Sequence, residues 1–325
     1  MADPLPRLLL VLAERPGMRA AVAQRLPRVP FAFVADTPPS GQAAVEAVLL
    51  GSVGRDGASW EPSASPSLRF VQRFFAGVDD VPFERLGPAV EVAGNVGGMA
   101  PFVAEHAIAL ALACARCVPA GQAAVAAGRM RPPPELRSFW HESAVVLGYG
   151  AIGQAIAERP RPFEMRLSGL SRRGAPAPGL ERSWSADQLE QAVADVGYVF
   201  DARPLTRATR GSLGAQEFGA MREDATYVNV GRGATVDERA LFAHLQGHPR
   251  FRAGIDVWWD EDFVGGALRM REPFAQLPNF VGSPHWAGFS PAVGEHALWT
   301  ALDNLARFFA GERPRHVVDR SEYAP

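Results

Sequence analysis

One nine-residue stretch, Val145–Gly153, restricts the fold of this chain more than any other. It reads VVLGYGAIG, an apolar run that ends in three glycines spaced G-x-G-x-x-G. The run predicts a buried strand, and the residues after the second glycine predict a helix. In that setting Gly148 permits a tight turn, Gly150 lets the backbone approach a pyrophosphate, and Gly153 lets helix and strand pack closely. The motif indicates a dinucleotide-binding turn, with a plain glycine turn of an α/β protein as the alternative.

The composition is typical of a globular protein and bounds its partners. The chain has 325 residues, of which 47% are hydrophobic and 21% are charged, with a formal net charge of −2. Such a length suggests two domains, and so small a net charge predicts no binding to nucleic acid or anionic lipid. No apolar run is long enough to span a bilayer. Leu8–Leu12 is too short for a signal-peptide core and reads as a first strand, so we expect a cytoplasmic location.

Two features of residue usage exclude whole classes of chemistry. All 33 basic residues are arginine, so neither a Walker-A phosphate loop nor a lysine Schiff base is available. The two cysteines, Cys114 and Cys117, are spaced C-x-x-C in an alanine-rich helical stretch without a thioredoxin-type strand before it. We interpret them as two buried thiols on one helical face rather than as a redox pair or half a metal site, and we predict no bound metal.

Short apolar runs alternate with helical stretches over the first hundred residues, which predicts a doubly wound α/β domain with a parallel sheet. Helices are expected over Met18–Arg25 and Gln42–Ala47. The strands are expected at Leu8–Leu12, Phe31–Val34, Val48–Leu50, Phe70–Phe74 and Val90–Val92.

A second α/β series follows a long helical stretch, 103–128, which Pro119 should kink or divide, and a proline-rich link, 131–134. Six strands with crossover connections match a dinucleotide-binding sheet. The helix Ala292–Phe309 is expected to return to the first domain, which makes that domain discontinuous and the cleft between the domains the default site. The six strands are expected at Ala144–Leu147, Arg166–Leu170, Val196–Phe200, Ala225–Val230, Ala253–Val257 and Phe280–Gly282.

Residues suited to chemistry follow the later strands of the second series, namely Arg232, Asp256, Glu261 and His285. The carboxyl ends of parallel strands face the ligand crevice in such a sheet, so these side chains are expected to converge on one cofactor. Taken singly, three of them have a plainer interpretation: surface charge for Arg232, a solvated acidic loop for Glu261, and a satisfied loop residue for His285. Their joint order favours a shared site.

On these motifs the chain resembles the D-isomer-specific 2-hydroxyacid dehydrogenase family, over nearly its whole length and most strongly over 103–288. The resemblance implies a Rossmann cofactor domain, 101–288, inserted into a discontinuous flavodoxin-like substrate domain, 1–100 and 289–325. It implies reversible hydride transfer between a nicotinamide cofactor and a small 2-oxo acid, as in glyoxylate/hydroxypyruvate reductases. The matching pieces are the glycine turn, Val103–His106, Pro204–Thr206, Thr209, Asn229–Gly233, Ala253–Val257 and Pro284–His285.

The expected catalytic residues are Arg232, Glu261 and His285. Hydride transfer to a 2-oxo acid leaves negative charge on the carbonyl oxygen, and the protonated imidazole of His285 is suited to supply the proton. A carboxylate beside an imidazole stabilises its charged form, which is the expected role of Glu261. Arg232 offers the substrate a planar, permanent cation. The resemblance implies that Asp256 holds the nicotinamide carboxamide, whereas His106 is interpreted as structural.

The substrate carboxylate is expected at the loop Ala76, Gly77 and Val78, because similar proteins present backbone N–H groups there. Asn95 is expected beside it, and Arg232 and His285 complete the substrate-binding set. The expected cofactor-binding residues are Gly148, Tyr149, Gly150, Ala151, Ile152, Gly153, Ser171, Arg172, Arg173, Pro204, Thr209, Val230, Gly231, Asp256 and Gly288.

The residues at the end of the second strand, about 20 residues after the glycine turn, indicate which cofactor is preferred. NAD-specific relatives carry an acidic residue there. This chain has Ser171, Arg172 and Arg173 there and no acid. A serine and two arginines can bind a 2′-phosphate, so we predict a preference for NADP(H), with NAD(H) possible and plain surface arginines as the alternative. Arg203 departs from the apolar residue usual before the proline in similar proteins, and nothing in the sequence explains it.

Several points stay open from the sequence. Trp258, Trp259 and Trp286 depart from the family pattern, so the particular 2-hydroxy acid is not identified. The apolar helix beginning near Val103 predicts a homodimer contact, as in similar proteins. A non-catalytic dinucleotide sensor of the co-repressor kind is an alternative function, because fold and function separate. Formate or phosphite oxidation is another, although formate enzymes of this type would carry glutamine in place of Glu261.

Overall fold

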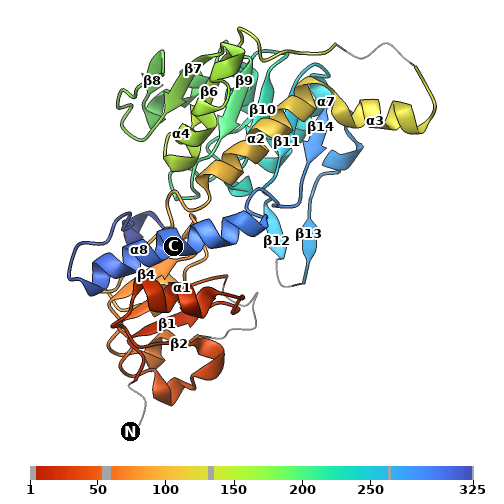
Figure 1. The fold of residues 1–325 in the computed structure, drawn as a ribbon. Coiled ribbons are helices and arrows are strands. Elements are labelled where there is room, and N and C mark those ends of the chain that lie inside the picture. Colours follow the sequence, from red (N-terminus) through yellow and green to blue (C-terminus); the bar gives the residue numbers. More distant parts are fainter. Residues whose placement is uncertain (1–4, 53–59, 131–134, 263–264, 324–325) are drawn as a thin grey trace. The chain divides into compact units, whose positions relative to one another are not determined.

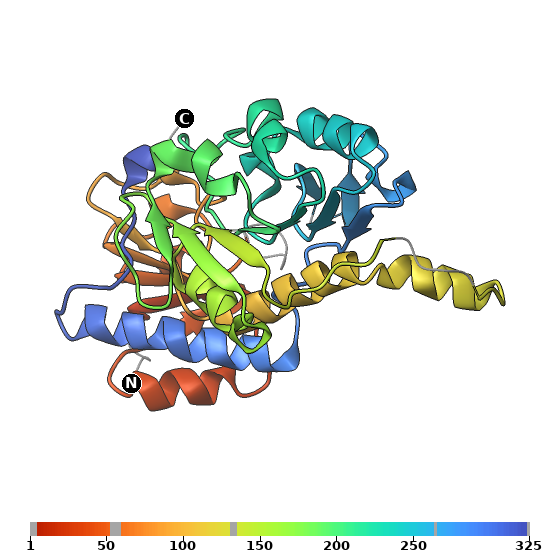
Figure 2. The same cartoon turned by 90° about the horizontal axis from the view of Figure 1, so that it is seen from above.

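The computed structural model describes residues 5–52, 60–130, 135–262 and 265–323. The proline-rich link expected at 131–134 therefore lies outside the described residues. The chain divides into two compact units (Figures 1 and 2): unit 1 comprises residues 1–99 and 289–325, and unit 2 comprises residues 100–288. Each unit is built on its own parallel sheet, which confirms the predicted fold class. The assignment of substrate to unit 1 and cofactor to unit 2 stays a prediction.

Unit 1 contains a five-stranded sheet in the order β2-β1-β3-β4-β5. Its central strands are uninterrupted apolar runs, LLLV in β1 and AVLL in β3, and every residue of both is buried. This pattern arises because a parallel sheet with crossover connections is covered on both faces. The strands are β1 (Leu8–Val11), β2 (Phe31–Phe33), β3 (Ala47–Leu50), β4 (Phe70–Arg73) and β5 (Glu91–Ala93).

Among the described residues of unit 1, two α-helices pack on each other, α1 (Met18–Arg25) and α8 (Pro291–Phe309). α8 also packs on β4, so the end of the chain returns to the first sheet as expected. The side-chain amide of Asn304 in α8 donates to Oε1 of Gln72 in β4 over 2.7 Å. That buried contact ties the two parts of the discontinuous unit together.

The prediction of a helix over Gln42–Ala47 is wrong. The preceding residues form a 3-10 turn, Pro39–Gly41, and β3 already begins at Ala47. The Gln42 side-chain amide instead donates to the Thr37 carbonyl over 3.1 Å, so the segment enters the strand as a loop.

Unit 2 contains a seven-stranded parallel sheet in the order β14-β11-β10-β9-β6-β7-β8. The sequence predicts six of these strands. The seventh, β8 (Arg182–Trp184), escapes prediction because its three residues lie at the sheet edge and carry no apolar run. The other strands are β6 (Ser143–Leu147), β7 (Arg166–Leu170), β9 (Tyr198–Asp201), β10 (Thr226–Asn229), β11 (Arg252–Ile255) and β14 (Phe280–Gly282).

The long helical stretch of unit 2 is two helices, α2 (Ala100–Ala115) and α3 (Val118–Ala126), bent by 60°. Pro119 is the second residue of α3, where proline suits a helix start. α2 packs on β10, β11 and α4, whereas no residue of α3 is buried. Within the described residues no single helix could span a membrane; only this bent pair passes by length and composition. The remaining helices are α4 (Ala151–Glu158), α5 (Leu189–Val193), α6 (Ala215–Ala220) and α7 (Glu238–Gly247).

The two cysteines lie on either side of the break between α2 and α3. Cys114 is buried and Cys117 is half-buried, and both are free thiols. Burial raises the pKa of Cys114 to about 12, which makes that thiol unreactive near neutral pH. The prediction of two buried thiols on one helical face is therefore right for Cys114 only, because α2 ends before Cys117.

Candidate active site

The candidate site of unit 2 lies along the carboxyl edge of its sheet (Figure 1). All seven strands are parallel, so their ends meet at one edge, which is where ligands bind in open α/β sheets. The turns that leave this edge carry most of the predicted residues. They are Gly148 after β6, Ser171 after β7, Gly231 and Arg232 after β10, Asp256 after β11, and His285 after β14.

The glycine turn has the geometry of a phosphate cradle. Gly148 takes a left-handed φ of +87°, which side chains disfavour. A Cβ on Gly153 would lie 2.3 Å from the Gly148 carbonyl oxygen, so α4 packs this closely only because residue 153 is glycine. A Cβ on Gly150 would project into open space. The turn thus leaves room for a ligand at the N-terminus of α4, and the residues present fit a bound pyrophosphate.

His285 and Glu261 form the central pair of the site. Nδ1 of His285 lies 3.0 Å from each carboxylate oxygen of Glu261, and the two side chains are 27% and 16% exposed. His285 takes a left-handed φ of +56°, and its backbone N–H donates to the Asp256 carbonyl over 2.8 Å. Glu261 is fixed by a second bond, since its Oε1 accepts from the Trp258 N–H over 2.8 Å. Because Nδ1 of His285 contacts Glu261, Nε2 is the ring nitrogen that faces other groups.

The acidic run around Glu261 is not the solvated loop that the sequence alone favours. It forms β12 (Asp260–Asp262), which pairs antiparallel with β13 (Ala267–Arg269). Arg269 bridges Asp260 and Asp262 over 3.3 and 3.0 Å. The hairpin turns the flanking aspartates to its exposed arginine, while Glu261, between them, bonds to the imidazole.

Asp256 is fully buried, and the protein's own donors surround its carboxylate. It accepts from Ser283 Oγ over 2.5 Å and from the backbone N–H groups of Trp286 and Ala287 over 2.8 and 3.0 Å. Nε2 of His106 lies 3.2 Å away. Burial would raise the pKa of Asp256, but these hydrogen bonds lower it below its ordinary value. Asp256 thus holds the turn that carries His285; its expected contact with the nicotinamide carboxamide stays a prediction.

His106, which the sequence interpretation takes as structural, joins the hydrogen-bonded cluster around Asp256. From α2 its Nε2 lies 2.8 Å from Ser283 Oγ, in addition to its contact with Asp256. Three elements distant in the chain, α2, the end of β11 and the end of β14, thus meet in one polar cluster. The signal was present in the Val103–His106 motif, but only the fold shows what this histidine faces.

Arg232 follows the turn after β10. The turn is tied by Asn229, whose side chain donates to the Arg232 carbonyl over 3.1 Å and accepts from the Gly231 N–H over 3.0 Å. Thr235 Oγ1 donates to the same carbonyl over 2.8 Å. The Arg232 guanidinium donates to the Gly231 carbonyl over 2.8 Å and is half-buried. The structure therefore brings His285 and Glu261 into contact and places Arg232 on the same sheet edge.

The end of β7 carries the residues expected to select the cofactor. Arg172 and Arg173 are exposed and Ser171 is half-buried. The Ser171 N–H donates to the Trp184 carbonyl over 3.0 Å, so the unpredicted strand β8 fixes this turn. Farther along the edge, Thr209 Oγ1 donates to the Pro204 carbonyl over 2.6 Å. That bond closes the loop in which both were expected to contact the cofactor.

The loop expected to receive the substrate carboxylate lies in unit 1. The buried Arg73 guanidinium at the end of β4 donates to the Gly77 carbonyl over 3.3 Å and to both Asp80 oxygens over 2.7 and 2.8 Å. Nδ2 of Asn95 donates to the carbonyls of Phe74 and Ala297, each over 2.8 Å. Asn95 is 2% exposed, so its amide hydrogens support the loop; its expected contact with substrate stays a prediction.

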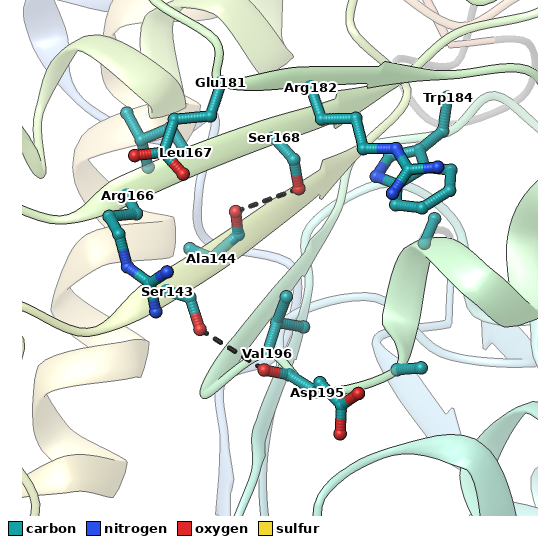
Figure 3. Close-up of a pocket in the computed structure, with 12 residues that line it drawn as sticks. Ser143, Ala144, Arg166, Leu167, Ser168, Glu181, Arg182, Trp184, Asp195 and Val196 are labelled. Atoms are coloured by element: carbon teal, nitrogen blue, oxygen red, sulfur yellow. Dashed lines mark hydrogen bonds between the residues drawn. The ribbon is translucent and has the colours of Figure 1, made fainter.

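A groove of about 180 Å³ lies at the opposite, amino edge of the unit 2 sheet (Figure 3). Two of its side chains have partners within the protein: Ser168 Oγ donates to the Ala144 carbonyl over 3.3 Å, and Arg182 stacks on Trp184 at 3.5 Å from the ring centroid. It contains none of the predicted site residues. Among the described residues no three His, Cys, Asp or Glu side chains are grouped as a metal site.

The parallel sheet and its glycine turn define a dinucleotide-binding α/β protein. The family model of the D-isomer specific 2-hydroxyacid dehydrogenase NAD-binding domain matches residues 108–287. The chain therefore belongs to the D-isomer specific 2-hydroxyacid dehydrogenase family, a family of oxidoreductases, as the sequence motifs predict.

Relatives with assigned activities agree with this membership. The chain is 28% identical over 268 residues to the glyoxylate reductase of Pyrococcus furiosus, covering 79% of this chain and 77% of that protein. It is 28% identical over 281 residues to glyoxylate/hydroxypyruvate reductase B of Yersinia enterocolitica, covering 83% of each. A solved NADPH-dependent glyoxylate/hydroxypyruvate reductase from Sinorhizobium meliloti, in complex with NADP and malonate, is 25% identical with a TM-score of 0.76 and 99% coverage of both chains.

Proposed function

We propose that this protein is a reductase of small 2-oxo acids, of the glyoxylate/hydroxypyruvate kind, acting reversibly on D-2-hydroxy acids. The Glu261–His285 pair supports this most strongly, because both carboxylate oxygens lie 3.0 Å from Nδ1. A carboxylate at Nδ1 orients the ring, which leaves Nε2 to exchange a proton with the substrate oxygen. The printed activities of the relatives support the same substrate class.

The residues divide the reaction as follows. When bound, the nicotinamide cofactor supplies the hydride that reduces the substrate carbonyl carbon. His285 gives a proton from Nε2 to the carbonyl oxygen, and takes it back in the reverse direction. Arg232 binds the carbonyl oxygen and the carboxylate as a planar cation. The backbone of residues 76–78, supported by Asn95, binds the carboxylate in unit 1.

We further propose NADP(H) as the preferred cofactor, with NAD(H) used less well. Arg172 and Arg173 are exposed at the end of β7, next to Ser171. A 2′-phosphate carries two negative charges that such cations neutralise. The NADP complex of the Sinorhizobium meliloti reductase supports this preference.

The assembly and location are also proposals. We propose a homodimer formed through α2 and α3, because α3 buries no residue and exposes the apolar Val118 and Val125 by 55% and 74%. Covering such side chains with a second copy removes apolar surface from water. A cytoplasmic location remains our expectation from the sequence.

Three other functions are weaker candidates. A dinucleotide sensor would need the fold but not the intact His285–Glu261 pair, which the chain retains. Formate oxidation is disfavoured by a carboxylate at Glu261, where a neutral amide is expected. Phosphite oxidation is compatible with the same residues and therefore belongs in the substrate panel.

The test is the loss of NADPH or NADH absorbance with a panel of 2-oxo acids, beside a His285→Ala variant. Turnover with NADPH that the variant lacks supports the reductase and the cofactor preference together. Turnover only with NADH would keep the reductase and remove the role of Arg172 and Arg173. Dinucleotide binding without turnover of any 2-oxo acid, formate or phosphite would favour the sensor.

A further inference from the structure

Asp201 and Arg203 form a buried ion pair at the carboxyl edge of the unit 2 sheet. Asp201 ends β9 and is fully buried, and Arg203 is 5% exposed. Arg203 donates from Nε to Oδ1 over 2.9 Å and from one terminal nitrogen to Oδ2 over 2.6 Å. Its other terminal nitrogen donates to Ser212 Oγ over 2.9 Å. The guanidinium is thus directed into the protein and not toward a ligand.

The pair is completed by bonds that fix the Asp201 carboxylate. Oδ1 also accepts from the Arg203 N–H over 3.1 Å, and Oδ2 accepts from the Tyr227 hydroxyl over 3.1 Å. Burial and the neighbouring carboxylate raise the pKa of Tyr227 well above its ordinary value, so the hydroxyl stays a donor. Burial opposes the charge on Arg203, yet the carboxylate of Asp201 raises the pKa of the guanidinium. The guanidinium therefore stays charged.

The backbone that this pair holds lies against two functional turns. A Cβ on Gly148 would lie 2.9 Å from the Ala202 carbonyl and from the Arg203 nitrogen. A Cβ on Gly231 would lie 2.6 Å from the Arg203 carbonyl oxygen. The Ala202–Arg203 peptide therefore touches both the glycine turn expected to cradle the pyrophosphate and the turn that presents Arg232.

We propose that the Asp201–Arg203 ion pair is a positioning device that sets the spacing between the dinucleotide turn at Gly148 and the substrate turn at Arg232. Buried ion pairs contribute little net stability relative to apolar residues of the same volume, so stability alone does not account for this one. An apolar side chain at position 203 would make no directional contacts. The bidentate hydrogen bonds of the ion pair instead fix the Ala202–Arg203 peptide in one orientation. This inference rests on the proposed function in one respect, which is the role of Arg232 in binding substrate.

The chain offers a matched control in the same unit. Arg137 is also buried, at 8% exposure, and pairs with Glu142 and Asp224 over 2.7 Å each. Glu142 and Asp224 precede β6 and β10, so this cluster lies at the amino edge of the sheet. Arg203→Lys and Arg137→Lys each keep the positive charge but lose the planar guanidinium that forms two hydrogen bonds at once.

The test measures the NADPH dissociation constant by calorimetry, the KM for glyoxylate, and the Tm of each variant. Arg203→Lys should weaken NADPH binding and raise the KM about tenfold each, because small misplacements of binding groups cost this much or more. Arg137→Lys should lower the Tm alone. Equal Tm losses with unchanged NADPH affinity and KM in both variants would overturn the proposal.

A second variant covers failure of Arg203→Lys to fold. The double replacement Asp201→Leu with Arg203→Leu removes both charges and keeps an apolar interior, so it should fold. Its NADPH affinity should still fall about tenfold, and wild-type affinity would refute the positioning role. Wild-type protein that binds NADPH but reduces no 2-oxo acid would refute the proposed function instead, and the NADPH affinities would still decide on the ion pair.

Discussion

The Nδ1 atom of His285 lies 3.0 Å from both carboxylate oxygens of Glu261. The backbone of His285 has a left-handed φ of +56°. This arrangement predicts separable effects. His285→Ala should lower kcat about 10²- to 10⁴-fold, because the general acid is lost, while NADPH affinity is retained. Glu261→Gln should lower kcat less, because a side-chain amide can still accept a hydrogen bond from Nδ1 and orient the ring. Steady-state kinetics and NADPH titration measure both.

The control for this prediction is His141, which resembles His285 in local geometry. It also has a left-handed φ, of +58°, and faces a carboxylate, that of Glu164, at 3.6 Å. It precedes β6 at the amino edge of the sheet. His141→Ala should leave kcat unchanged, and a kcat loss as large as that of His285→Ala would contradict the catalytic assignment.

Cofactor preference gives a second prediction. Replacing Arg172 and Arg173 together by alanine should raise the KM for NADPH roughly tenfold or more and leave the KM for NADH nearly unchanged, because only NADPH carries the 2′-phosphate. Arg166 and Arg182, exposed at the amino ends of β7 and β8, supply the matched double variant. Equal changes for both cofactors, or an effect of the control pair, would rule out phosphate recognition at this turn.

The sequence predicts most of the fold because parallel sheets leave a strong local trace. Strands such as β1 and β3 are buried on both faces and read as unbroken apolar runs. The misses are short elements without that trace. β8 is a three-residue edge strand, and the β12–β13 hairpin is held by charges rather than by apolar residues.

The site is predictable only as a set of residue types at one sheet edge. The contact of Glu261 with His285 follows from the hairpin, which local patterning does not indicate. The role of His106 depends on α2 passing beside Ser283, 177 residues later in the chain. Arg203 is unexplained in the sequence because its partner, Asp201, interrupts the apolar pattern only at the last residue of β9. Long-range packing, rather than spacing, decides each of these.

The dependence of stability on pH is a third prediction, centred on His244. Its ring lies between Phe218, His248 and Phe251. Burial, with a smaller contribution from His248, lowers the pKa of His244 to about 4. The unfolded chain therefore binds a proton there below about pH 6.5, whereas the folded protein does not until about pH 4. Stability should therefore fall as the pH drops through this window.

Replacing the imidazole tests this directly. His244→Phe should flatten the decline in unfolding free energy between pH 6.5 and 4.5, and His141→Ala should not. The slope is not expected to vanish, because burial and then Arg315 also lower the pKa of His316 in unit 1. Carboxyls with a lowered pKa, such as Asp256, act at lower pH. An unchanged slope in His244→Phe, from urea unfolding at each pH, would show that this histidine titrates normally.

The proposed homodimer gives the fourth prediction. Val125 on α3 is 74% exposed, and an arginine at this position should be harmless to the fold of a single chain. In a twofold interface the substitution appears twice, and burying each unpaired charge costs on the order of 2 kcal/mol or more. Val125→Arg should therefore weaken dimerisation at least about a hundredfold without changing the Tm of the separated subunit.

The control is Leu5→Arg, at an apolar residue of unit 1 that is 56% exposed, which should leave the sedimentation coefficient unchanged. Wild-type protein that sediments as a monomer at micromolar concentration would refute the dimer, and a dimer untouched by Val125→Arg would move the interface away from α3.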